Sequence, residues 1–185
     1  MSTAALFDRL RHMLESSGMP YMLTGSYASA VHGTPRATQD IDIVIGPSQT
    51  QLMSLLQQLP ETSYYVSHEA ALDALARRGQ FNVIDFATGW KVDFIIVKAR
   101  EFSREELKRR RVIELDGVPL YVASAEDLLI AKLEWAKLGA SARQLEDAAG
   151  IVRMQAEQLD RTYVERWVAE LGLDQQWVQV LGQTS

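Results

Sequence analysis

Residues 25–43 read GSYASAVHGTPRATQDIDI, a glycine–serine turn and small-residue segment followed by an isoleucine-rich stretch with two aspartates. The apolar segment 21–24 before it predicts a short strand, and Tyr27–His32 predicts a helix that stops at Gly33. Residues 39–45 are rich in β-branched side chains and predict a second strand. A glycine at a strand-to-helix turn lets a phosphate approach the backbone, and the N–H groups of the following helix favour anions.

The two aspartates of this stretch are Asp40 and Asp42. Residues two apart on a strand point to the same face, so both carboxylates project together while Ile41 and Ile43 face a core. Adjacent carboxylates repel each other and are costly to desolvate. A divalent cation removes both problems, and oxygen-only ligands suit magnesium or manganese. On its own, a D-x-D pattern is more often a solvated surface.

A third aspartate, Asp93, gives the pair more weight. It lies in WKVDFIIV, residues 90–97, a predicted strand apolar enough to be central, where a lone carboxylate is expensive. Three acids at one place are what a two-metal phosphoryl or nucleotidyl transfer site requires. Asp85, on the neighbouring predicted strand 81–86, is the rival for the third position. It ranks second because we expect it near the far end of the hairpin.

The rest of the chain predicts an α+β body, residues 1–122, and a helical region, residues 123–185, packed on it. Helical periodicity covers residues 3–16 and 70–78, and Asp116-Gly117 predicts a turn between two short strands. Four further helix starts are predicted from the spacing of a capping box or its aspartate variant: Ser48–Gln51, Ser103–Glu106, Ser141–Gln144 and Thr162–Glu165. Ser124–Asp127 has the same spacing at the start of the helical region.

Composition excludes several classes of protein. The 185 residues include no cysteine and three histidines far apart, which excludes disulfide scaffolds and thiolate zinc sites and argues against a zinc enzyme. A net charge of −5 argues against a protein that wraps duplex nucleic acid by bulk attraction. No apolar stretch approaches the roughly 20 residues of a membrane helix, and the N-terminus reads as an amphipathic helix. We therefore expect a cytoplasmic protein with no membrane partner.

The motif in residues 25–43 resembles the signature of the polymerase-beta-like nucleotidyltransferase superfamily. More closely, it is similar to small bacterial members related to the abortive-infection toxin nucleotidyltransferases. The resemblance covers about residues 20–152 and includes four later segments: NVID at 82–85, GWKVDF at 89–94, SAEDLLIAK at 124–132, and Arg143 with Asp147. It implies a nucleotidyltransferase fold, with a mixed β-sheet flanked by helices and a C-terminal helical region.

The resemblance also implies an enzyme. The reaction is a magnesium- or manganese-dependent transfer of a nucleoside monophosphate from a nucleoside triphosphate, such as ATP, to an acceptor hydroxyl. Asp40 and Asp42 would ligate two ions, and Asp93 would complete the metal site that activates the acceptor oxygen. Gly25 and Ser26 would hold the outer phosphates.

Three further residues match the family pattern. Arg36 would contact a phosphate or pair with Asp40 or Asp42, and Thr38 would lie beside the bound nucleotide. Lys132 would bind the triphosphate or remain a solvated lysine.

Several alternatives stay open at this point. The acceptor is a small molecule, a protein side chain or a tRNA end. A non-catalytic nucleotide-binding or toxin–antitoxin component with a cognate partner protein would retain the same fold. A manganese glycosyltransferase also uses D-x-D, but it needs a longer domain and leaves Gly25-Ser26 unexplained. The basic run Lys108–Arg111 suits RNA contact or, more simply, a helix C-terminus that attracts cations.

Overall fold

The computed structural model describes residues 3–33, 38 and 40–184. By their internal contacts these residues form two compact units. The first unit comprises Met1–Thr24 and Thr38–Val122, and the second comprises Gly25–Ala37 and Ala123–Ser185.

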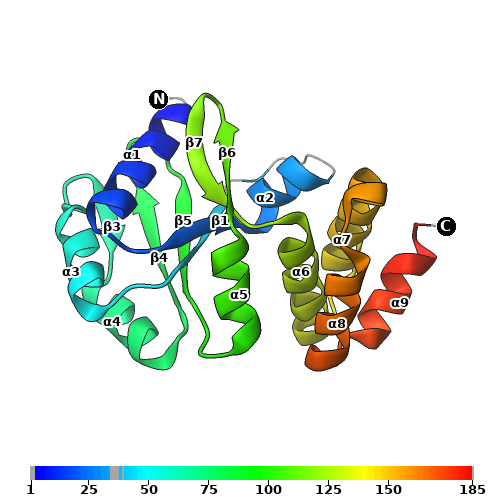
Figure 1. Cartoon of the computed structure of the whole chain (residues 1–185). Coiled ribbons are helices and arrows are strands. Elements are labelled where there is room, and N and C mark those ends of the chain that lie inside the picture. The colour runs from blue at the N-terminus through cyan, green and yellow to red at the C-terminus, as the bar shows by residue number, and fades with distance from the viewer. Residues whose placement is uncertain (1–2, 34–37, 39, 185) are drawn as a thin grey trace. The chain divides into compact units, whose positions relative to one another are not determined.

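The first unit is built on one mixed β-sheet (Figure 1). Strands β2 and β5 pair in parallel, as do β1 and β7, and the other neighbours are antiparallel. This confirms the predicted α+β class with a mixed sheet. In sheet order the strands are β3 (Tyr64–Val66), β4 (Gln80–Asp85), β5 (Lys91–Ile96), β2 (Asp40–Ile45), β1 (Tyr21–Thr24), β7 (Val118–Val122) and β6 (Arg111–Leu115).

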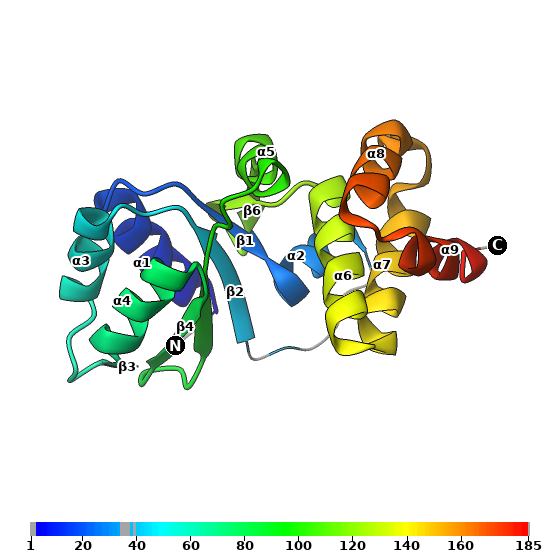
Figure 2. The ribbon, with the colours of Figure 1, turned by 90° about the horizontal axis from the view of Figure 1, so that it is seen from below.

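Helices cover one face of this sheet and form the core with it. Figure 2 shows α1 (Thr3–Ser16), α3 (Gln49–Gln57) and α4 (His68–Arg77) together on one side of strands β2 and β4. The covered face carries buried apolar side chains from the central strands, including Ile41, Ile43, Val92 and Phe94. Helix α5 (Glu101–Arg109) follows β5 and buries Phe102.

Two local predictions are confirmed in detail. Ser48 and Gln51 form the capping box of α3, with each side chain accepting the other residue's backbone N–H, at 3.3 and 2.9 Å. Asp116 and Gly117 have φ of 51° and 82°, the left-handed pair that a tight β-hairpin turn requires.

Two predicted helix caps are wrong. Helix α5 begins at Glu101, so Ser103 lies inside it, buried, and its hydroxyl accepts from the Arg100 side chain at 3.0 Å. Helix α8 (Arg161–Leu171) is capped by the Asp160 side chain rather than by Thr162. The predicted helix start at Ser141 is confirmed, because Ser141 is the N-cap residue of α7 (Ala142–Gln155), although its side chain makes no capping hydrogen bond. Strand β3 has no counterpart in the prediction.

The second unit is helical. It contains α2 (Gly25–His32), α6 (Ala125–Gly139), α7 (Ala142–Gln155), the short 3₁₀ helix η1 (Ala156–Gln158), α8 and α9 (Asp174–Gly182). Helix α2 comes from the N-terminal half but packs against α6 and α7. His32 anchors it there, because its ring bonds the Ala123 carbonyl at 2.8 Å and its carbonyl accepts from Gln155 at 3.0 Å. In the described part of the chain, no helix combines the length and apolarity needed to cross a membrane.

Candidate active site

Strand register places three aspartates on the face of the sheet opposite the one that α1, α3 and α4 cover, called the open face below. In the parallel pair β2–β5, Asp42 lies directly opposite Asp93, and Asp40 lies opposite Lys91. Residues opposite each other on neighbouring strands share a face, so all four side chains project to the side away from Ile41 and the rest of the buried core.

The row through Asp42 and Asp93 extends across two more strands. Thr24 on β1 pairs with Asp42, and Asn82 on β4 pairs with Asp93. Neighbouring strands lie about 4.8 Å apart. Two metal ions in a two-metal site are typically about 3.5–4 Å apart. The spacing of the two facing carboxylates is therefore compatible with binding such a pair of metal ions.

A lysine of the same strand lies among these acids. The Lys91 Nζ donates to an Asp93 carboxylate oxygen at 2.8 Å and lies 3.7 Å from Asp40 Oδ1. The hydrogen bond to Asp93 raises the pKa of Lys91 above its ordinary value, and the charges of Asp93, Asp40 and Asp42 act in the same direction against partial desolvation. The acid cluster is thus already organised around a cation.

This donor set suits a hard metal ion by its chemistry, since it offers carboxylate oxygens only. With the side chains as they stand, no group of three or more histidine, cysteine, aspartate or glutamate residues in the described ranges converges to hold an ion. The Lys91 ammonium lies between Asp93 and Asp40, 2.8 Å from an oxygen of the first and 3.7 Å from an oxygen of the second. The ammonium is itself a stand-in cation and marks where positive charge is stabilised.

Asp85, the rival of Asp93, projects from the opposite face. Register pairs Val83 with Val92 and Asn82 with Asp93, which turns Asp85 toward the helix-covered side. There it is buried at 2% exposure and accepts an ion-paired hydrogen bond from Arg9 of α1 at 2.8 Å. Asp85 therefore fastens a helix to the sheet and does not share a face with Asp40 and Asp42.

The predicted phosphate-binding turn has the backbone that glycine permits. Gly25 has φ of 64° at the start of α2, directly after Thr24 in the chain. Its carbonyl accepts from the Ser29 hydroxyl at 2.8 Å, one turn along the helix. Ser26 is the next residue of α2 and is partly exposed.

Arg36 lies outside the described residues. Thr38 lies next to the acid strand, where its hydroxyl accepts from the Asp40 N–H at 3.3 Å.

Lys132 is buried, which the sequence did not indicate. Its side chain is 4% exposed, and Nζ lies 2.7 Å from Asp147 Oδ2, between α6 and α7. The role of Lys132 toward a triphosphate stays a prediction.

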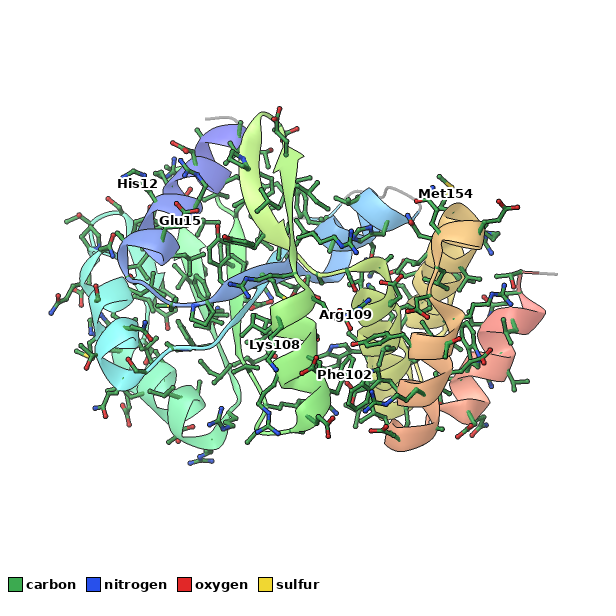
Figure 3. The ribbon with its side chains drawn as sticks, viewed as in Figure 1. His12, Glu15, Phe102, Lys108, Arg109 and Met154 are labelled. Atoms are coloured by element: carbon green, nitrogen blue, oxygen red, sulfur yellow. The ribbon has the colours of Figure 1, made fainter. Side chains whose placement is uncertain are left out.

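Two cations of the basic run near residue 110, Lys108 and Arg110, have partners within the first unit. Figure 3 labels Lys108 and Arg109 near the end of α5, where the chain leads into β6. Lys108 pairs with Glu105 at 2.8 Å, and the Arg110 guanidinium stacks over the Tyr121 ring at 4.7 Å. Cations at a helix C-terminus with such partners are accounted for by the helix dipole and local packing.

Comparison with known proteins identifies the fold. No protein-family model and no curated protein matches the sequence. Solved structures do match, and they show that the chain has a nucleotidyltransferase fold.

Three of these structures are similar over most of the chain. One is ANT(2'')-Ia in complex with adenylyl-2''-tobramycin, with a TM-score of 0.63 at 13% identity, over 96% of this chain and 99% of that one. The lincomycin-bound lincosamide antibiotic adenylyltransferase LnuA has a TM-score of 0.56 at 14% identity, over 83% and 98% of the two chains. An antigenic nucleotidyltransferase-like protein from Paracoccidioides brasiliensis has a TM-score of 0.53 at 16% identity, over 81% and 73%.

Proposed function

We propose that this protein is a nucleotidyltransferase that moves a nucleoside monophosphate from a nucleoside triphosphate to an acceptor hydroxyl. The observation that carries the proposal is the pairing of Asp42 with Asp93 on adjacent central strands, with Asp40 on the same face. The nucleotidyltransferase fold supports it. A non-catalytic partner retaining the fold is not favoured, because such a protein has no need of three carboxylates on one sheet face.

Asp40, Asp42 and Asp93 would hold one or two magnesium or manganese ions. Bound there, the ions would stabilise negative charge on the attacking and leaving oxygens. Residues 1–122 would supply this catalytic machinery. Gly25 and Ser26, at the start of α2, would hold the outer phosphates through backbone N–H groups and the serine hydroxyl.

The chain's own residues would handle the proton and the approach of the acceptor. A carboxylate oxygen of Asp93 would accept the proton of the acceptor hydroxyl. The hydroxyl oxygen would then form its bond to the α-phosphorus while the bond from that phosphorus to the bridging oxygen breaks and pyrophosphate leaves. Because Asp42 occupies one side of Asp93, the acceptor would approach from the other side, where Asn82 is exposed.

Beyond Asn82 the open face is neutral and aromatic. Tyr65 and Phe86 are 55% and 56% exposed on the β3–β4 side, and register places Tyr65 opposite Ile84, which shares the open face with Asn82. The Phe86 N–H donates to the Ser63 carbonyl at 3.0 Å, which continues the β3–β4 pairing and makes Phe86 a diagonal neighbour of Tyr65. These rings offer stacking area to a hydroxyl-bearing ring of the acceptor.

The test is transfer of an α-labelled nucleotide. Full-length protein is incubated with each labelled triphosphate and magnesium, with total tRNA, cell protein or small metabolites as acceptor. We expect label in one pool, lost on chelation, and a loss of about a hundredfold or more in Asp42→Asn and Asp93→Asn.

Asp73→Asn is the matched control, since Asp73 is an exposed α4 carboxylate paired with Arg77 at 2.8 Å. It should leave transfer unchanged. Absence of label in every pool, or full activity in Asp42→Asn, would reject the proposal.

A further inference from the structure

The Lys91 ammonium lies in the acid cluster formed by Asp40, Asp42 and Asp93. Its Nζ lies 2.8 Å from Asp93 and 3.7 Å from Asp40, so it spans the two strands that carry the acids. With Asp42 opposite Asp93, the three carboxylates and this ammonium sum to a formal charge of −2.

The position of the ammonium conflicts with that of a metal ion. An ion ligated by Asp93 and Asp40 would compete with Lys91 for their carboxylate oxygens, and it would repel a positive charge a few ångströms away. The Lys91 side chain is 41% exposed, so its ammonium can withdraw into water without becoming a buried charge. The geometry therefore offers two exclusive occupants for one place.

We propose that Lys91 is a resident counter-ion that a divalent metal must displace, so that it sets the metal concentration at which the acid cluster loads. The inference rests on the proposed function, because it takes Asp40, Asp42 and Asp93 as the metal ligands. In the metal-free protein Lys91 relieves the repulsion among the carboxylates. On loading it gives up Asp93, and the cost of breaking that contact weakens the apparent affinity for metal.

The expected size follows from the exposure of the pair. Exposed or partly exposed ion pairs contribute a factor of about two to five in an equilibrium constant. Replacing the lysine by an uncharged, unbranched side chain one atom shorter should therefore tighten metal binding by about two- to fivefold. The same substitution should lower the unfolding midpoint of the metal-free protein, because the carboxylates then repel each other unshielded.

The experiment measures Mn²⁺ binding by the full chain, following free Mn²⁺ by electron paramagnetic resonance and heat by calorimetry. The variants are Lys91→Met and Lys91→Gln, with Lys98→Met as the matched control, because Lys98 is exposed just beyond β5. Asp42→Asn is included as the variant that should lose binding. Thermal unfolding without and with Mn²⁺ is recorded for each protein.

We expect both Lys91 variants to bind Mn²⁺ two- to fivefold more tightly than wild type and to gain more thermal stability from it, while Lys98→Met matches wild type. Equal or weaker binding in both Lys91 variants, with Asp42→Asn still defective, overturns the inference and leaves the proposed function standing. If wild type binds no Mn²⁺, or Asp42→Asn binds it normally, the metal assignment itself fails and the inference fails with it.

Discussion

Removing the Asp147 carboxylate tests whether Lys132 is a structural residue. The pair is buried, at 4% and 11% side-chain exposure, with 2.7 Å between Nζ and Oδ2. Breaking a buried pair by deleting one partner costs about 3–5 kcal/mol, because the other charge stays buried without compensation. We therefore expect Asp147→Ala to lose that amount of unfolding free energy. With a urea m-value of roughly 2–3 kcal/mol/M, the midpoint falls by about 1–2.5 M.

Urea unfolding followed by circular dichroism measures this change. Glu146→Ala is the matched control, since Glu146 is an exposed carboxylate on the same helix and its loss should change stability by less than about 0.5 kcal/mol. The double variant Lys132→Met/Asp147→Leu should recover most of the loss, because apolar side chains of similar volume replace a buried pair at little cost. A loss below about 1 kcal/mol in Asp147→Ala would refute the structural role and favour Lys132 as a phosphate ligand.

Three further outcomes are expected. Gly25→Ala should lower the thermal unfolding midpoint by an amount equivalent to about 1–2 kcal/mol, because Gly25 has φ of 64°, whereas Gly139→Ala, in a helix with open space around it, should raise it. Burial, reinforced by the Glu15 charge, raises the pKa of Tyr21 to about 12. The neutral phenol contributes its full stability below the unfolded-state pKa near 10, and this contribution is lost between pH 10 and 12. The unfolding free energy of Tyr21→Phe should therefore fall by about 2–3 kcal/mol less than that of wild type over that interval, as measured in urea titrations. Replacing Tyr65 and Phe86 together by alanine should raise the acceptor KM and leave the triphosphate KM unchanged in steady-state kinetics; an unchanged acceptor KM would place the acceptor elsewhere.

The sequence shows the pair Asp40 and Asp42, but it does not show the register of β2 against β5 that places Asp93 opposite Asp42. A period of two puts Asp40 and Asp42 on one face wherever the strand lies. Whether Asp93 joins them depends on which residues of β5 oppose them, and a slip of one position would turn Asp93 to the core and bring other side chains forward. Register also decides between Asp93 and Asp85. Both lie on predicted strands, and the sequence does not show which of them shares a face with Asp42.

Side-chain spacing predicted the ends of some helices and turns correctly and those of others wrongly. The capping box at Ser48 and the turn at Asp116 are confirmed, whereas the Ser103 and Thr162 spacings occur inside helices that begin earlier. A serine or threonine followed three residues later by glutamate is also a common helix-interior pattern, so spacing cannot place the cap. Strand β3 is only three residues long, too short for a periodic signal.

The sequence contains a signal for Lys91 that the D-x-D pattern does not include. The spacing Lys91-x-Asp93 on a strand puts the two side chains on one face by the same rule that joins Asp40 to Asp42. A lysine near acids is usually interpreted as a solvated ion pair. Only the parallel pairing with β2, which sets Lys91 opposite Asp40, makes it a cation shared between two strands.

The architecture explains how this face of the sheet can hold several carboxylates close together. The residues that alternate with the acids, Ile41, Val92 and Phe94, are fully buried against the helices, so each carboxylate is attached to backbone that the core holds in place. A site on central strands keeps its charges at fixed spacing, which a loop does not. Carboxylates that cannot move apart stay repulsive until a cation arrives, and this stored repulsion is what would make a cation bind tightly there. By the proposal above, Lys91 would reduce that repulsion in the free protein, so the rigidity that would favour metal binding would also make a resident ammonium useful.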